Sequence, residues 1–148
     1  RLGVIGKIFH LNKLLIDTSL LIAVLRGNRK IGKYLNRLIN TARLYVSVIT
    51  LIEIYVGAIS VRHEREAQEL LSNFEIVPID EEVAKETVIL IKNYPGIFGK
   101  AASRGTADAL IAAGAISIKA KLITLNSRHF EKIDKNDLDV EIIEPEKT

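Results

Sequence analysis

Strand-like and helix-like segments alternate along almost the whole of this sequence. Five short apolar runs have the length typical of buried strands, and they are KLLID, RLYVSVI, EIVPID, AKLITLN and VEIIEP. The longer amphipathic or apolar runs between them predict helices. Because parallel neighbouring strands need crossover connections, this order predicts an α/β fold of three layers, in which helices cover both faces of a central, mostly parallel sheet.

Three segments carry more specific predictions. Pro78 in EIVPID indicates an edge position or a strand end, because proline cannot donate a hydrogen bond to a neighbouring strand. The segment PGIFGKAASRG (95–105) is predicted to be a glycine-containing loop. The helix TLIEIYVGAIS (50–60) is apolar on nearly every side, which predicts that it is buried and that its single acid points into a cleft.

The chain has 148 residues, enough for one domain with a substantial core, and we expect that domain to span 13–148 after a ragged lead at 1–12. The absence of cysteine excludes disulfides, thiolate metal sites and cysteine nucleophiles. The net charge of +3 permits a polyanionic partner without requiring one. Acids at Asp17 and Glu53 interrupt the two longest apolar runs, so we expect no signal peptide, no membrane span and a cytoplasmic protein.

Three carboxylates stand alone in otherwise uncharged segments. Asp17 is the sole charge between Lys13 and Arg26, at the carboxyl end of the first predicted strand. Glu53 lies in the helix after the second strand, and Asp108 lies in the first turn of the alanine-rich helix TADALIAAGAISI. Taken singly, each has an ordinary structural explanation as a helix cap, a first-turn acid or a partner of a distant cation. The repeated pattern indicates a shared site.

Ligands in parallel α/β sheets bind at the carboxyl ends of the strands, where these acids are expected to gather. Carboxylates gathered there repel one another by on the order of 4 kcal/mol per close pair in a partly solvated site, so a positive group must offset the repulsion. Oxygen ligands without histidine or cysteine are hard, and they select Mg²⁺ or Mn²⁺ over zinc or copper. Carboxylate clusters around Mg²⁺ commonly perform phosphate chemistry.

Four motifs of this chain resemble those of the PIN-domain family, in the same order. They are LLIDTSLLIAVL with Asp17, SVITLIEIYVGA with Glu53, TADALIAAGA with Asp108, and LITLNSRHFEKI after it. The resemblance runs from about residue 14 to 145, and it is strongest to the VapC-type toxins of prokaryotic toxin–antitoxin pairs.

The resemblance implies a PIN-like fold and an endoribonuclease that depends on Mg²⁺ or Mn²⁺. The three lone acids, Asp17, Glu53 and Asp108, carry over as its metal-binding catalytic residues. Thr18 and Thr124 match positions where the family often has a hydroxyl near the acids. The resemblance also implies an RNA substrate, a homodimer, and an antitoxin peptide bound across the acidic groove, where a basic side chain approaches the carboxylates.

Asn126 departs from the family pattern, because members commonly have a fourth acid two residues after the threonine of the last motif. An amide oxygen contacts a metal or a metal-bound water but contributes no negative charge. We therefore count Asn126 among the catalytic residues and hypothesise one tightly held ion.

Basic residues near these motifs are candidate substrate contacts. Lys100, Arg104 and Arg128 are placed to face a phosphate backbone, although solvated surface charge explains them equally well. His129 is expected to be a packing or strand-end residue, because a metal-bound water needs no separate general base.

Three alternatives remain open. Asn126 favours a non-catalytic PIN-like module that binds RNA or a protein. A receiver-like phosphoacceptor at Asp17 is disfavoured, because no lysine directly ends the strand after Asp108. The nuclease target is also compatible with DNA. The glycine-containing stretches lack the spacing of a phosphate-binding loop, and no glycine–serine elbow occurs, which excludes a nucleotide-phosphate site and a serine hydrolase.

Overall fold

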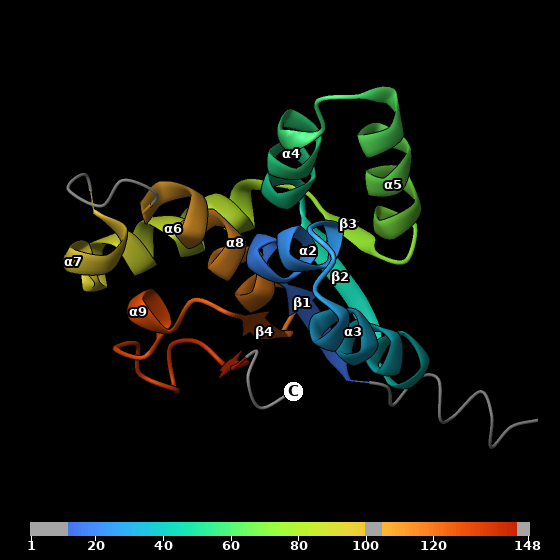
Figure 1. The fold of residues 1–148 in the computed structure, drawn as a ribbon. Helices are drawn as coiled ribbons and strands as arrows, with labels where there is room; N and C mark the ends of the chain where they lie inside the picture. The colour runs from blue at the N-terminus through green and yellow to red at the C-terminus, as the bar shows by residue number, and fades with distance from the viewer. Residues whose placement is uncertain (1–11, 100–104, 145–148) are drawn as a thin grey trace, which may run out of the picture.

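A five-stranded parallel sheet forms the centre of the computed structural model, which describes residues 12–99 and 105–144. The strands are β1 (Lys13–Ile16), β2 (Arg43–Ser47), β3 (Glu75–Val77), β4 (Lys121–Thr124) and β5 (Val140–Ile142). They lie in the order β3-β2-β1-β4-β5, and every neighbouring pair is parallel (Figure 1). The chain builds one half of the sheet from β1 to β3 and then returns to add β4 and β5 on the other side of β1.

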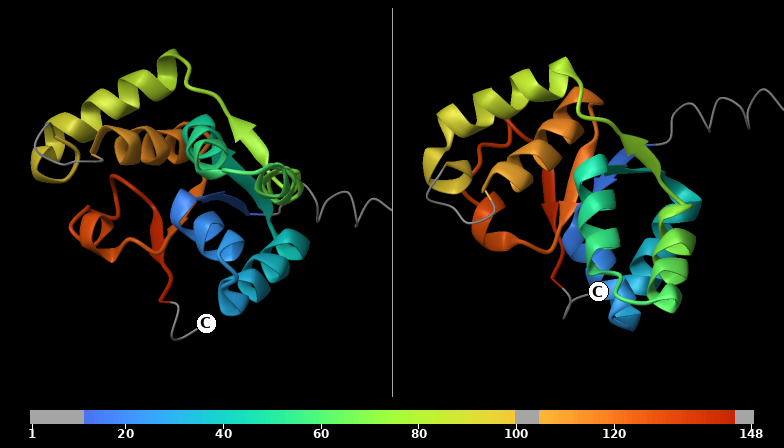
Figure 2. Two further views of the ribbon diagram at one scale, coloured as in Figure 1. Left: turned by 45° about the horizontal axis from the view of Figure 1, so that its top comes forward. Right: turned by 90° about the horizontal axis from the view of Figure 1, so that it is seen from above.

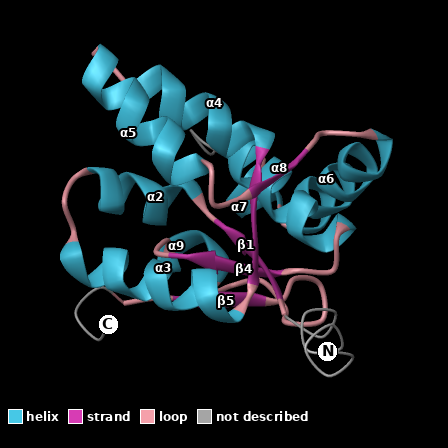
Figure 3. Ribbon diagram, turned by 90° about the vertical axis from the view of Figure 1, so that its right-hand side faces the viewer, coloured by secondary structure: helices cyan, strands magenta, loops and turns pink. Residues whose placement is uncertain are grey.

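Helices cover both faces of this sheet, so the predicted three-layer α/β architecture is confirmed (Figure 2). One core lies between the sheet and helices α6 and α8, and the other lies between the sheet and α2, α3 and α5. Helix α4 lies beside α5 (Figure 3). In the described residues the helices are α2 (Thr18–Leu25), α3 (Arg29–Thr41), α4 (Val48–Gly57), α5 (Val61–Leu71), α6 (Glu81–Asn93), α7 (Pro95–Phe98), α8 (Gly105–Ser117) and α9 (Ser127–Phe130).

β1 is the central strand, and its side chains alternate between the two cores. Leu15 belongs to the core under α6 and α8, whereas Leu14 and Ile16 belong to the core under α2 and α3. All three side chains are buried. A strand that is covered on both faces needs apolar residues at successive positions, which explains the uninterrupted run before Asp17.

Helix α8 approaches the sheet closely because its buried positions hold small residues. Ala109, Ala112 and Ala113 are fully buried in the core against the sheet. At the start of the helix, a Cβ added to Gly105 would lie 2.7 Å from the backbone carbonyl carbon of Phe98. Glycine is therefore required for α8 to begin against α7, and this contact fixes the first turn, which carries Asp108.

Two boundaries differ from those predicted. Residues 95–98 form the single helical turn α7 instead of a loop, because Pro95 occupies the first helical position, where its missing N–H is not needed. The helix after β2 begins at Val48, since the Ser47 hydroxyl accepts a hydrogen bond from the N–H of Ile49 at 3.1 Å and caps it. As predicted, Pro78 directly follows a strand at the edge of the sheet.

Some of the predictions concern residues that the structure does not describe. Residues 1–11 of the expected lead, and Lys100 and Arg104 of the expected loop, lie outside the described residues. Within the described ranges, no helix is long and apolar enough to cross a membrane.

Candidate active site

Asp17 lies directly after β1, at the point where the chain enters α2. It occupies the N-cap position of α2, yet within the described chain its carboxylate makes no capping hydrogen bond. Its Oδ2 atom instead accepts hydrogen bonds from Thr124 Oγ1 at 2.7 Å and from Ser19 Oγ at 2.8 Å. The side chain is buried, and both donors are uncharged hydroxyls. The ordinary capping explanation therefore fails for Asp17.

The two hydroxyls are themselves oriented by the backbone that follows β4. Thr124 Oγ1 accepts the N–H of Asn126 at 3.0 Å, and Ser19 Oγ accepts the N–H of Leu125 at 3.1 Å. Each hydroxyl accepts one backbone proton and donates its own to Asp17, which fixes the direction of both O–H bonds. This arrangement joins the ends of β1 and β4, where the strand order reverses and where parallel α/β sheets bind ligands.

Glu53 reaches the same edge of the sheet from α4. Because Ser47 ends β2 and caps α4, the first turns of this helix stand beside the end of β1. Thr18 Oγ1 donates a hydrogen bond to Glu53 Oε1 at 3.0 Å and lies 2.8 Å from the hydroxyl of Thr50. Since the single proton of Thr18 goes to Glu53, Thr50 is the donor of the second bond.

The environment of α4 corrects one prediction. The helix is not buried on every side, because only Thr50 and Ile54 are buried along its length. Its exposed apolar residues Ile52, Tyr55 and Val56 are spaced three and four positions apart and form a stripe, and Ile59, which follows the end of the helix, is exposed as well. Although α4 is apolar on nearly every side, the described part of the chain leaves one of those sides exposed to solvent. Glu53 lies at the boundary and is partly exposed.

Asp108 reaches this edge from the first turn of α8. Helix α8 precedes β4 and runs back along the sheet, so its first turn stands at the carboxyl ends of the strands. Its carboxylate is buried, and Oδ2 lies 2.8 Å from Nδ1 of His129. The same ring nitrogen lies 3.0 Å from Nδ2 of Asn126. His129 is thus a polar member of the site, and the prediction of a packing or strand-end role is wrong.

The short helix α9 explains why sequence reasoning missed His129. Asn126 is the N-cap of α9, and residues three apart on a helical turn lie on one side, which brings the amide and the imidazole together. The spacing of Asn126 and His129 was the available signal, but it required a helix at this point. Arg128 lies on the same turn and is exposed to solvent.

Hydrogen bonds connect most of the predicted residues into one network, and Glu53 belongs to a second group beside it. One part contains Asp17 with Thr124, and the N–H of Asn126 links it to the part that contains His129 and Asp108. Thr18, next to Asp17 in sequence, connects to Glu53. All three lone acids therefore lie at one edge of the sheet.

The side chains nevertheless do not form the tight carboxylate cluster expected from the sequence. In residues 12–99 and 105–144, no group of three or more histidine, aspartate or glutamate side chains is arranged to hold a metal ion. Each acid is oriented by its own neighbours, and repulsion between like charges favours such separation. The donors themselves, which are carboxylates, hydroxyls and one amide, have the hard oxygen chemistry that suits Mg²⁺ or Mn²⁺.

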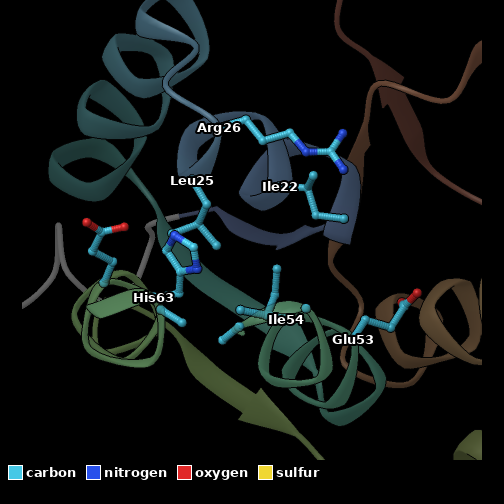
Figure 4. A pocket seen from close by; sticks show the side chains of 10 residues that line it. Ile22, Leu25, Arg26, Glu53, Ile54 and His63 are labelled. Atoms are coloured by element: carbon cyan, nitrogen blue, oxygen red, sulfur yellow. The ribbon is translucent and has the colours of Figure 1, made fainter. Parts of the chain in front are cut away.

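A groove adjoins the acidic edge between α2, α4 and α5. Its volume is about 240 Å³. Ile22, Leu25 and Ile54 supply apolar lining, and Glu53 lies on the side toward α8, with His63 across the groove (Figure 4). The groove therefore combines apolar lining with charged residues, which are Arg26, Glu66 and Glu53, the acid that Thr18 contacts.

Comparison with known proteins identifies the class that this fold and site define. A family model described as the PIN domain matches residues 14–136, and the chain belongs to the PIN-domain family. Ribonuclease VapC10 of Mycobacterium tuberculosis is 30% identical over 122 residues, which cover 82% of this chain and 89% of the relative. Identity at this level over most of both chains places the protein with the VapC-type members of that family.

Two solved structures share the architecture. VapBC2 from Rickettsia felis, bound to a DNA fragment from its promoter, gives a TM-score of 0.75 at 22% identity and covers 89% of this chain and 99% of that chain. A toxin–antitoxin complex from Klebsiella pneumoniae gives a TM-score of 0.71 at 29% identity and covers 89% and 97%. The first likeness establishes the fold, and the second is to a toxin–antitoxin complex.

Proposed function

We propose that this protein is a metal-dependent endoribonuclease and the toxin of a VapBC-type toxin–antitoxin pair. The observation that carries the proposal is the position of Asp17, Glu53 and Asp108 at one edge of the sheet, in a chain whose relatives are named VapC ribonucleases. We propose that this activity takes place in the cytoplasm, where its RNA target would be found.

In the proposed site, Asp17, Glu53 and Asp108 would hold Mg²⁺ or Mn²⁺. When bound, such an ion supplies an activated water and stabilises charge that develops on the phosphate. Thr124 and Ser19 hold the Asp17 carboxylate through two hydroxyl donors, and groups that orient a metal ligand in this way contribute to its affinity. Thr18 acts in the same way on Glu53.

Asn126 supports a site with one tightly held ion. Its neutral amide stands where the family commonly has a fourth acid, so the site carries one negative charge fewer to offset a second cation. Arg128 is exposed on α9, beside this edge, and is available to contact the phosphate backbone of RNA. Lys100 and Arg104 keep the same proposed role, although they lie outside the described residues.

The proposal is tested by incubating the purified chain with RNA and with DNA, each with and without Mn²⁺, beside the variant Asp108→Asn. We expect metal-dependent cleavage of RNA by the wild type and its loss, by at least about a hundredfold, in the variant, because the charged oxygen is removed. Cleavage of DNA alone would change the substrate class. No cleavage of either nucleic acid by the wild type would refute the nuclease.

The second candidate is a non-catalytic module with the same fold, and Asn126 is the observation that favours it. Such a module would bind RNA through basic side chains such as Arg128 and would not need the acids. It predicts RNA binding that survives Asp17→Asn, without cleavage by either protein. A gel-shift assay run beside the cleavage assay distinguishes the two functions.

The groove between α2, α4 and α5 supports an antitoxin partner for the proposed toxin. Apolar side chains of a peptide fit the lining formed by Leu25 and Ile54, and a basic side chain at one end would reach Glu53. Such a peptide would occupy an acid of the proposed active site, which explains how binding would inhibit cleavage.

Leu25→Asp tests this partner. An acid in the apolar lining must lose its hydration when a peptide binds. We therefore expect the affinity of this chain for its antitoxin to fall about a hundredfold. Titration calorimetry with the purified partner measures the change. Asn36→Asp, which adds the same charge on the exposed side of α3, is the matched control. Equal affinity of Leu25→Asp and wild type would place the antitoxin elsewhere.

The exposed stripe on α4, together with Ile59 just after the helix, supports a homodimer. Val56 is 78% exposed and Ile59 is 85% exposed, although both are large apolar residues. Contiguous apolar surface of this kind commonly marks a protein–protein interface. The stripe borders the groove, whose lining includes Gly57 and Ala58, so a second copy would lie next to a bound antitoxin.

A further inference from the structure

His129 is bonded to two residues of the site through a single ring nitrogen. Its Nδ1 atom lies 2.8 Å from Oδ2 of Asp108 and 3.0 Å from the side-chain amide of Asn126. We propose that His129 is a positioning residue, which uses Nδ1–H to fix the orientation of both Asp108 and Asn126. This inference rests on the proposed metal-dependent activity, because it concerns the residues that would hold the ion.

The chemistry of the three groups determines which tautomer is present. An ionised carboxylate only accepts hydrogen bonds, so a bond of 2.8 Å to Asp108 requires the proton on Nδ1. Nδ1 then has no lone pair left for the Asn126 amide nitrogen. The amide oxygen and nitrogen occupy nearly equivalent positions, so the side chain is satisfied when it turns Oδ1 toward the same N–H. His129 thereby selects one orientation of Asn126.

This arrangement requires a neutral residue at position 126. The Nδ1–H of His129 already interacts with the carboxylate of Asp108, and an amide oxygen shares that proton without adding a second full negative charge. The departure of Asn126 from the family pattern and the presence of His129 are therefore linked. Together they replace one acid with a neutral amide that the imidazole N–H holds in a defined orientation.

The imidazole is held in place by its own short helix. Phe130, the next residue, is 1% exposed and packs against Phe98, with ring centroids 6.2 Å apart. On the other side of the turn, the N–H of Asn126 is bonded to Thr124. The helix is thus anchored at both ends, which keeps the backbone of His129, whose side chain is 34% exposed, close to Asp108.

Substituting His129 with asparagine and with glutamine distinguishes the role of Nδ1 from that of the other ring nitrogen, Nε2. The amide nitrogen of asparagine lies close to the position of Nδ1, whereas that of glutamine lies close to the position of Nε2. His129→Asn therefore keeps a donor for Asp108, and His129→Gln and His129→Ala remove it. We expect the last two variants to bind Mn²⁺ about 10- to 100-fold more weakly, the usual effect of losing a group that orients a ligand. His129→Asn should recover most of that loss.

Binding of Mn²⁺ is measured by calorimetry and by electron paramagnetic resonance, so the result does not depend on cleavage. The metal-free wild type provides a second readout, because long-range ¹H–¹⁵N spectra in mildly alkaline buffer identify the tautomer of the imidazole, and we expect protonation at Nδ1. Thermal unfolding of the metal-free variants shows whether α9 keeps its packing. A merely structural role for His129 would lower stability without the difference between asparagine and glutamine.

Failure of this inference is distinguishable from failure of the proposed function. If the wild type binds Mn²⁺ and cleaves RNA, but all three variants bind the ion equally well or equally badly, the positioning role is wrong and the nuclease stands. An Nε2-protonated tautomer would also refute the positioning role. If the wild type neither binds Mn²⁺ nor cleaves RNA, the proposed function is wrong.

Discussion

Asp17→Asn is expected to reduce metal-dependent cleavage of RNA by on the order of a thousandfold. Substituting partners that merely orient a metal ligand commonly costs 10- to 100-fold, and Asp17 would itself be a ligand, so the loss should be larger. Asp17 is also firmly oriented, because two hydroxyl groups donate to the same oxygen. Initial rates at saturating Mn²⁺ measure the effect.

The same variant has a second readout that does not depend on activity. Asparagine keeps an oxygen that accepts the Thr124 and Ser19 hydrogen bonds, and it removes a buried negative charge. We therefore expect the metal-free variant to unfold at the same temperature as the wild type or at a higher one, while the stabilisation by Mn²⁺ is lost. Asp139→Asn, at an exposed carboxylate, is the matched control. Normal cleavage by Asp17→Asn would remove Asp17 from the proposed mechanism.

Val56→Asp is expected to convert a homodimer into a monomer. In a symmetric interface, the substitution places one acid on each copy, and each acid loses its hydration without a partner. The dissociation constant should rise at least about a hundredfold. Light scattering after size-exclusion chromatography, over a range of protein concentrations, measures the mass of both proteins.

Asn36→Asp again serves as the control, because it adds the same charge on α3, away from the stripe. A wild type that remains monomeric at all concentrations would refute the homodimer. A variant that remains fully dimeric would place the interface on another surface. Val88 and Ile89 of α6, which are 50% and 49% exposed, are the next candidates.

Local sequence signals predicted most of the architecture. The apolar run before Asp17 indicated a buried strand, and β1 is the central strand of the sheet, covered on both faces. The edge position indicated by Pro78 is confirmed as well. These predictions succeeded because the periodicity of apolar residues and the backbone limits of proline act over a few neighbouring residues.

Two wrong predictions, the burial of α4 and the packing role of His129, concern features that depend on which distant elements pack beside them. The composition of α4 was typical of a buried helix, but its exposed side depends on which elements pack against it, and a single sequence does not specify them. Likewise, the role of His129 depends on a contact with Asp108, 21 positions earlier in the chain. The three-residue spacing of Asn126 and His129 becomes a signal only once the helical turn α9 is known.

The sequence by itself determined the order of strands and helices along the chain. It also placed each lone acid at the start of a helix or within one, at the edge of the sheet where the parallel strands end. Only the tertiary structure decided how these acids are held. Asp17 is oriented by Thr124, 107 positions away, and Asp108 by His129. The physical reason is that helix and strand formation depend on residues a few positions apart, whereas the orientation of a carboxylate depends on donors that only the complete fold brings within hydrogen-bond distance.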